Sequence, residues 1–190
     1  MDQQTPVHIK FIEVSKKLFW KHGIKRITVE EICKEATLSK MTFYRYFKNK
    51  EDIAKQVMQY VFNQSKLKYM NIMENNDDFR TKVNKLVILK HNDVQGISAE
   101  FINEIYQNKT SNLYKTLEDS KKEMQNIVLS DFKKAQENGD IRQDLNLNFI
   151  VFMLNDINEK LLDKKLNKMY PNKEALIMEL TNFFFYGILH

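Results

Sequence analysis

The segment Thr28–Lys50 constrains the fold more than any other part of the chain, because its pattern encodes two short helices joined by a tight turn. Thr28 followed three residues later by Glu31 has the spacing of a capping box, which starts a helix. Apolar residues then recur every three to four positions, which predicts one buried stripe on a helix at about 29–35. Ser39 is placed to cap a second helix. The segment therefore predicts a helix-turn-helix at about residues 29–48.

The second helix divides its side chains between two faces. Phe43 and Phe47 are four residues apart, so they share the face that packs inward. Asn49 has the pattern of a third cap, and Lys50 opens a long helix whose positive N-terminal end suits a phosphate. An ordinary helical hairpin with a solvated basic face fits the two-helix pattern equally well.

A longer composite pattern separates these two interpretations. It extends from Phe11 to Ile53 and consists of Phe19, Gly23, Thr28, Ile32, Ala36 and the series Ser39-Lys40-x-Thr42-x-Tyr44-x-Tyr46-Phe47-Lys48-x-Lys50-Glu51. This pattern closely resembles the N-terminal DNA-binding domain of TetR-family transcription regulators. The chain departs from that family where Cys33 replaces the usual Ala, Thr37 the usual Gly and Met41 a small residue. A left-handed backbone at Thr37 would cost a β-branched residue about 1–2 kcal/mol.

The resemblance implies an all-α fold of about nine helices in two domains. Residues 1–50 are expected to form a three-helix DNA-binding domain, and residues 51–190 a helical domain that binds an effector and dimerises. Its implied partners are double-stranded DNA with a near-palindromic operator, a second copy of the chain, and a small effector. From side-chain length and hydroxyl placement, the candidate DNA-contacting residues are Thr28, Lys40, Thr42, Tyr44, Arg45, Tyr46 and Lys50.

The charge distribution agrees with a phosphate-binding N-terminal part. Residues 1–50 hold 11 Lys and Arg against 5 Asp and Glu, whereas residues 51–190 hold 19 against 20. The positive charge of the chain therefore belongs to the N-terminal unit. The abundance of Lys, Asn and Ile also fits an AT-rich genome, so composition alone does not separate DNA binding from codon bias.

Only four Gly and two Pro interrupt the remaining chain, which favours long helices. Helices are predicted at about 7–22, 50–74, 79–91, 98–108, 111–138, 147–169 and 172–189. The last two are apolar on more than one face, so part of their surface is expected to be covered by a second copy, or else buried as a hairpin within one subunit. The predicted dimer seam is Ile177, Leu180, Phe184 and Ile188.

An apolar or aromatic effector is the prediction for the second domain, because its helices are rich in aromatic residues and Met. The candidate lining residues are Phe62, Phe101, Ile105, Tyr106, Phe132 and Phe152, although each one taken alone fits an ordinary core position better. No nucleophile, acid–base or paired-Cys metal motif is present, so neither a catalytic residue, a metal site nor a cofactor is predicted. The N-terminus lacks a signal-peptide pattern and no apolar run has membrane length, so the cytoplasm is the expected location.

Taken together, the sequence predicts a dimeric, sequence-specific transcriptional regulator, with a repressor released by a small molecule as the favoured form. An effector-dependent activator remains an alternative within the same class. A helical carrier or sequestering protein without a regulatory role is the second class considered, and an enzyme is the third. The concentration of positive charge before Glu51 favours the regulator.

Overall fold

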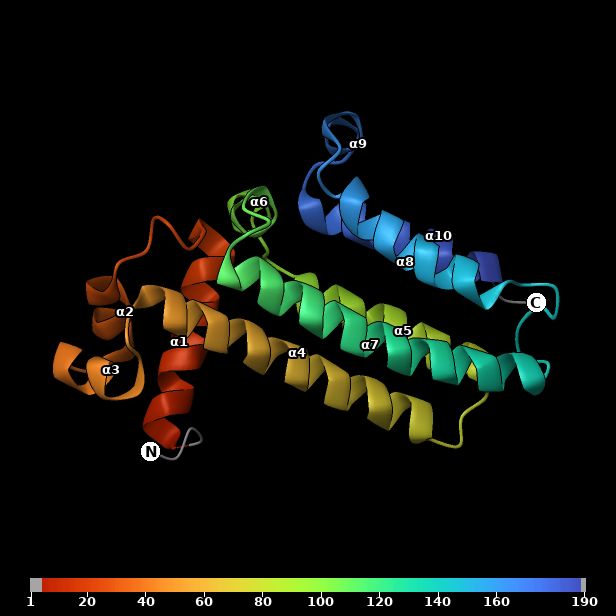
Figure 1. Cartoon of the computed structure of the whole chain (residues 1–190), viewed down its shortest axis with the longest axis horizontal. Coiled ribbons are helices and arrows are strands. Elements are labelled where there is room, and N and C mark those ends of the chain that lie inside the picture. The colour runs from red at the N-terminus through yellow and green to blue at the C-terminus, as the bar shows by residue number, and fades with distance from the viewer. Residues whose placement is uncertain (1–4, 189–190) are drawn as a thin grey trace. The chain divides into compact units, whose positions relative to one another are not determined.

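The computed structural model describes residues 5–188, and all side chains in that range except those of Leu154, Ile157, Asn158, Glu159 and Ile188. Ten helices form the described part, one more than the approximate number predicted (Figure 1). They are α1 Pro6–His22, α2 Val29–Ala36, α3 Lys40–Tyr46, α4 Lys50–Glu74, α5 Phe79–Val94, α6 Ala99–Gln107, α7 Asn112–Glu137, α8 Leu147–Lys160, α9 Lys164–Met169 and α10 Lys173–Ile188. None of these helices is long and apolar enough to cross a membrane.

The chain forms two compact units. Unit 1 contains the described residues up to Asn63 together with Gly96–Ser120, and unit 2 contains Gln64–Gln95 and the described residues from Lys121 onward. Unit 1 therefore holds α1, α2, α3 and α6 complete, and takes the beginning of α4 and of α7.

The core of unit 1 is built on α1, as the apolar spacing of that helix predicts. Phe11, Ile12 and Phe19 of α1 are buried there with the inward residues of α2, α3 and α4. Thr5 caps the start of α1 by accepting from the N–H of His8. Gly23 ends the helix with φ +78°, a conformation that residues with a side chain rarely adopt. The predicted glycine stop is confirmed.

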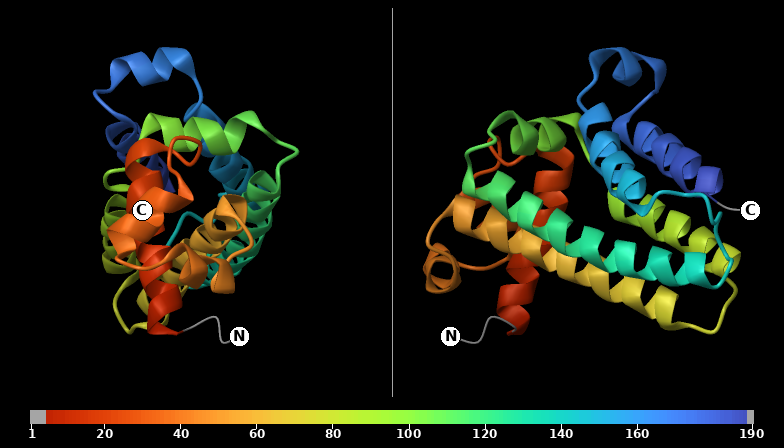
Figure 2. Two further views of the ribbon diagram at one scale, coloured as in Figure 1. Left: turned by 90° about the vertical axis from the view of Figure 1, so that its left-hand side faces the viewer. Right: turned by 45° about the vertical axis from the view of Figure 1, so that its right-hand side comes forward.

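Helix α6 joins the same unit by packing against the C-terminal end of α1 (Figure 2). The N–H of Ser98 donates to the carbonyl of Trp20 at 2.8 Å. The rings of Trp20 and Phe101 lie 4.4 Å apart between centroids. Residues almost 80 positions apart in sequence thus share one core.

Unit 2 is a second helical core, in which α10 packs against α5 (Figure 2). Its fully buried centre is Phe132 of α7, which contacts the rings of Phe79 and Phe184. Ile141, Leu145 and Ile150 close the same cluster. The apolar character of the C-terminal helices therefore contributes mainly to a core within one chain.

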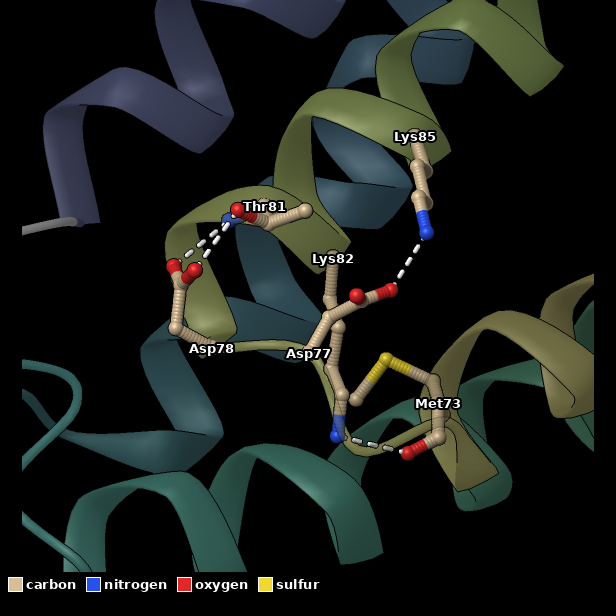
Figure 3. Close-up of polar contacts among 6 residues, drawn as sticks. All are labelled: Met73, Asp77, Asp78, Thr81, Lys82 and Lys85. Carbon is tan, nitrogen blue, oxygen red and sulfur yellow. Dashed lines mark hydrogen bonds and ion pairs between the residues drawn. The ribbon is translucent and has the colours of Figure 1, made fainter.

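The turn between α4 and α5 is fixed by polar contacts within three pairs of residues (Figure 3). Asp78 caps α5, accepting from the N–H of Thr81 at 2.9 Å and from its hydroxyl at 2.7 Å. The ammonium of Lys82 donates to the carbonyl of Met73 at 2.8 Å, which satisfies an orphan carbonyl at the end of α4. Lys85 forms an ion pair with Asp77.

The continuous helix predicted at 147–169 is wrong, because the structure divides it into α8 and α9. Asp163 caps α9 by accepting from the N–H groups of Lys165 and Leu166. The buried ammonium of Lys173 donates to the carbonyl of Leu161, which holds the connecting turn. No Gly or Pro marks this break. An Asp side chain that accepts from nearby backbone N–H groups offers an alternative to helix continuation, and the contact from Lys173 adds to it here.

Candidate nucleic-acid interface

The start of α2 has the capping box that its sequence predicts. The N–H of Glu31 donates to the Thr28 hydroxyl at 3.1 Å, and the Glu31 carboxylate accepts from the N–H of Thr28 at 2.7 Å. The same hydroxyl donates to that carboxylate at 2.9 Å. These bonds lower the pKa of Glu31. Thr28 was a candidate DNA contact, and its hydroxyl is engaged in holding α2.

The turn between α2 and α3 is made by Thr37, whose backbone is left-handed with φ 54° and ψ 40°. Its N–H donates to the carbonyl of Lys34 at 3.1 Å, and the N–H of Leu38 donates to the carbonyl of Cys33 at 3.0 Å. The Thr37 hydroxyl donates to the carbonyl of Ala36 at 2.6 Å. The turn thus keeps the geometry that glycine adopts easily, with a β-branched residue in its place.

The inner face of α3 fixes the orientation of this helix. Phe43 and Phe47 are fully buried, and both make edge-to-face contacts with Phe11 of α1, at centroid distances of 5.5 and 5.8 Å. Ser39 caps α3 by accepting from the N–H of Thr42 at 3.0 Å. The predicted division of α3 into an inner and an outer face is therefore present.

Lys40 is the first residue of α3, lies on its outer face and forms an ion pair with Glu30 of α2. The hydrogen bond between these two groups raises the pKa of Lys40 and lowers the pKa of Glu30. The pair is exposed to solvent, so it orients the Lys40 side chain more than it stabilises the fold.

The remaining candidates on α3 differ in their exposure and in whether their hydroxyl groups already have a hydrogen-bond partner within the protein. Tyr44 and Arg45 are exposed. The Thr42 hydroxyl lies 2.9 Å from the Ser39 hydroxyl, and the Tyr46 hydroxyl accepts from Thr5 at 3.1 Å. A phenol that accepts still has its proton to donate, so Tyr46 keeps one hydrogen bond for a phosphate.

Lys50 lies at the start of α4, which Asn49 caps by accepting from the N–H of Asp52 at 2.9 Å. The Lys50 ammonium donates to the carbonyls of Lys25 at 2.9 Å and Ile27 at 2.8 Å. Its first role is therefore to hold the loop before α2. One of its three N–H groups remains for another acceptor.

Met41 was not among the predicted DNA contacts. In the structure, 79% of its surface is exposed on the outer side of α3, between the positions of Lys40 and Thr42. The sequence signal that could have identified Met41 is its size, because the family that the chain resembles usually has a small residue at this position.

The six candidate effector-lining residues do not lie together. Phe62, Phe101, Ile105 and Tyr106 belong to or pack against the core of unit 1, whereas Phe132 is the centre of the core of unit 2. Phe152 is 63% exposed. Helical spacing identified apolar positions correctly, but it does not distinguish a core residue from one that lines a cavity.

A cavity of about 630 Å³ does lie within unit 2, at a size suited to a small ligand. Its walls come from the end of α4, the start of α5 and the second half of α7. The apolar lining residues are Met70, Met73, Phe79, Ile127 and Ala135, and the polar ones are Glu74, Lys82, Asn126, Ser130, Asp131, Lys134, Asn138 and Asp140. None of the six predicted residues is among them.

The residues of the predicted dimer seam differ in their exposure within the single chain. Ile177 and Phe184 are buried within unit 2, Leu180 is partly buried, and the side chain of Ile188 lies outside the described residues. The exposed aromatic residues of α8 and α10 form a different set, which we call the aromatic face: Phe149, Phe152, Phe183 and Tyr186. A three-to-four spacing selects one face of a helix, but it does not distinguish burial in the core of the same chain from burial against a second copy.

The described residues contain no group of three or more His, Cys, Asp or Glu side chains placed to hold a metal ion. Cys33 is buried in unit 1, and burial raises the pKa of its thiol. A buried thiol of raised pKa is a poor nucleophile, so Cys33 serves packing.

Comparison with known proteins agrees with the geometry of unit 1. Residues 11–57 match the family described as "Bacterial regulatory proteins, tetR family". Among curated relatives, the uncharacterized HTH-type transcriptional regulator YuxN of Bacillus subtilis (strain 168) is 34% identical over 88 residues, which cover 43% of this chain and 30% of YuxN. The chain spans about 30% of the length of the curated relatives that it matches.

Solved structures with the same fold extend the likeness to nearly the whole chain. The fatty acid degradation regulator FadR from Bacillus halodurans is 19% identical with a TM-score of 0.72, covering 97% of each chain. The regulatory protein TetR from Rhodobacter sphaeroides is 15% identical with a TM-score of 0.73, covering 97% of this chain and 100% of that one. At such identities the likeness concerns the fold alone. Residues 11–57 with their helix-turn-helix are therefore similar to the tetR family of bacterial regulatory proteins, and the described chain as a whole has the fold of these solved regulators.

Proposed function

We propose that this protein is a sequence-specific DNA-binding transcriptional regulator that inserts α3 into the major groove of its operator. The observation that carries the proposal is the two-sided character of α3. Buried Phe43 and Phe47 fix the helix, while Lys40, Tyr44 and Arg45 stand exposed on its outer side. The same N-terminal region holds the excess of basic residues.

A gel shift with DNA from upstream of the protein's own gene, next to random DNA, tests this proposal. Lys40→Ala is expected to weaken operator binding by about 1–3 kcal/mol and to relax sequence preference, because it removes a contact to a base edge. Arg45→Ala should act in the same direction. Lys68→Ala, in unit 2, is the matched control for removing an exposed cation. Equal binding of wild type to operator and random DNA would refute sequence-specific recognition.

We further propose that the chain acts as a homodimer on a near-palindromic operator with half-sites about one helical turn apart. The aromatic face supports this step, because exposed aromatic side chains on two adjacent helices are costly to leave in water. Sedimentation at micromolar concentration measures the assembly state directly. A monomer at that concentration would contradict the proposal.

The proposed control of DNA binding is release by a small effector held in the second domain, as a repressor. The unit 2 cavity is the supporting observation, with thioether and aromatic groups next to a few charged ones. Binding would couple to DNA only if the effector has different affinities for the DNA-competent and DNA-incompetent states. Ile127→Trp should fill the cavity, so a compound that releases wild type from its operator should fail to release this variant.

The functional division proposed for the chain is DNA binding by residues 1–50 and effector binding with dimerisation by residues 51–190. Helix α4 contributes residues to both compact units, which fits a role as the mechanical link. Because its proposed target is DNA, the protein is expected to act in the cytoplasm. Gene regulation, and not catalysis or ligand carriage, is the proposed role.

A further inference from the structure

Met41 is the most exposed large apolar side chain among the described residues of unit 1, with 79% of its surface in solvent. Tyr44, three residues further along α3, is 57% exposed. Residues three apart lie on the same side of a helix, so Met41 and Tyr44 form an apolar pair on the outer side of α3. Phe43 lies on the opposite side of α3, where it contacts Phe11 of α1 together with Phe47, the residue that ends the helix.

Met41 lies on a helix whose start and inner side have several contacts with the rest of unit 1. Ser39 caps the helix just before it, and the neighbouring Lys40 is tied to Glu30 of α2. The ring of Tyr44 packs edge-on against buried Phe43 at 5.3 Å between centroids. The apolar pair is therefore presented by a helix that is anchored at its start and along its inner side.

The proposed DNA-binding function determines which surface can cover this pair. The major groove exposes hydrogen-bonding edges at every base pair, but its one apolar group is the 5-methyl of thymine. A methionine side chain has no hydrogen to donate and only a weak acceptor, so it cannot distinguish bases by hydrogen bonding. Its thioether is flexible and polarizable, which suits contact with a methyl group.

We infer that Met41 is a specificity-determining residue that recognises a thymine in each operator half-site through its 5-methyl group. This inference rests on the proposed insertion of α3 into the major groove. It adds a contact that selects thymine by apolar burial, beside the charged contacts assigned to Lys40 and Arg45. Cytosine and deoxyuridine at the same position lack the methyl and should be bound less tightly.

The experiment is a double-mutant cycle between the protein and the DNA. The operator is first selected from random DNA with the full-length wild-type protein. Each thymine of one half-site is then replaced by deoxyuridine, which removes only the methyl group. At one thymine, wild type should lose about fourfold in affinity, the loss expected when one buried methyl group is removed. Met41→Ala should bind the unmodified operator more weakly and show no further loss at that thymine.

Two other variants control the cycle. Met41→Leu keeps the apolar contact and should retain most of the sensitivity to deoxyuridine. Met169→Ala removes an equally exposed methionine from α9 and should behave as wild type at every position. Thermal unfolding should show that Met41→Ala folds normally, because the side chain makes little contact within the protein.

The possible failures are distinguishable. If wild type selects no sequence, the proposed DNA recognition and this inference both fail. If wild type selects an operator but Met41→Ala still loses as much affinity as wild type at every deoxyuridine, the inference alone is overturned. The methyl group is then recognised by another residue, and Tyr44 is the first to test.

Discussion

The carboxylate of Glu104, in α6, accepts a hydrogen bond from the backbone N–H of Ile24 at 2.6 Å. The same oxygen accepts from the N–H of Lys25 at 2.9 Å, so one side chain closes the loop that follows α1. A Cβ at Gly23 would lie 2.7 Å from the other carboxylate oxygen. A glycine at the end of α1 and a carboxylate on α6 therefore suit each other, because the glycine leaves room for the carboxylate that binds the loop.

Removing the carboxylate should destabilise unit 1. Glu104→Ala is expected to lower the free energy of unfolding by about 2 kcal/mol, because two backbone N–H groups lose a charged acceptor. Glu100→Ala, at an exposed position of the same helix, is the control and should change it by less than about 0.5 kcal/mol. Urea unfolding followed by circular dichroism measures both. Equal stability of the two variants would show that water replaces Glu104 without cost.

Adding a methyl group at Gly23 should be harmful for two separable reasons. Gly23→Ala places a side chain at φ +78° and brings it into contact with Glu104, so a loss of about 2 kcal/mol or more is expected. In a Glu104→Ala background the collision with the carboxylate disappears, while the backbone cost and the close approach to the Cβ of Glu100 at 3.3 Å remain. The two substitutions should therefore cost less together than the sum of their separate effects. Strict additivity in denaturant titrations would exclude the collision.

The left-handed turn residue offers a stabilising substitution. Thr37→Gly should raise the free energy of unfolding by about 0.5–1 kcal/mol, since the relief of about 1–2 kcal/mol of strain exceeds the loss of two exposed or partly exposed hydrogen bonds. Thr37→Ala keeps the strain, loses the hydroxyl and should be the less stable variant. The midpoints of thermal unfolding rank the three proteins. A Thr37→Gly protein less stable than wild type would mean that the hydroxyl contacts outweigh the strain.

Two adjacent phenylalanines of α10 should respond in opposite ways to a polar substitution. Phe183 is 76% exposed and Phe184 only 7%, so Phe183→Ser should leave the fold intact while weakening assembly through the aromatic face. Phe184→Asp buries an unpaired charge beside Phe132 and should unfold unit 2. Sedimentation with parallel circular dichroism separates the two effects. A folded Phe183→Ser protein that still dimerises at full strength would remove α10 from the interface.

Acid should loosen the start of α5. The two hydrogen bonds from Thr81 lower the pKa of Asp78 below its usual value of 3.8. A carboxylate with a lowered pKa stabilises the folded state above its unfolded pKa, and this contribution is lost as the pH falls through its folded pKa. Asp78→Asn, which still caps but does not titrate, should therefore show a smaller fall in melting temperature between pH 7 and pH 3 than wild type. Asp78→Ala should already melt lower at pH 7.

The features that depend on residues close together in the sequence, such as helix caps, were predicted correctly. Thr28, Ser39 and Asn49 all cap helices as predicted, because a cap depends on only three or four neighbouring residues. The break at Asp163 and the burial of Phe184 depend on partners that are distant in sequence, namely Lys173 and Phe132. The same is true of Lys50, whose ammonium is bound to the loop before α2. Residue type and spacing alone do not show whether a lysine binds a backbone carbonyl of its own chain or a phosphate of DNA.

The pairing of Lys40 with Glu30 also affects how DNA binding would depend on salt. A lysine that neutralises a phosphate releases cations condensed on the DNA, and this release makes binding steeply dependent on ionic strength. Lys40 already has a counterion, and this counterion is covalently part of the protein. Its transfer from Glu30 to DNA would exchange one fixed anion for another and leave a carboxylate that attracts a cation. The protein would therefore bind its operator with a shallower salt dependence than the number of its basic contacts implies.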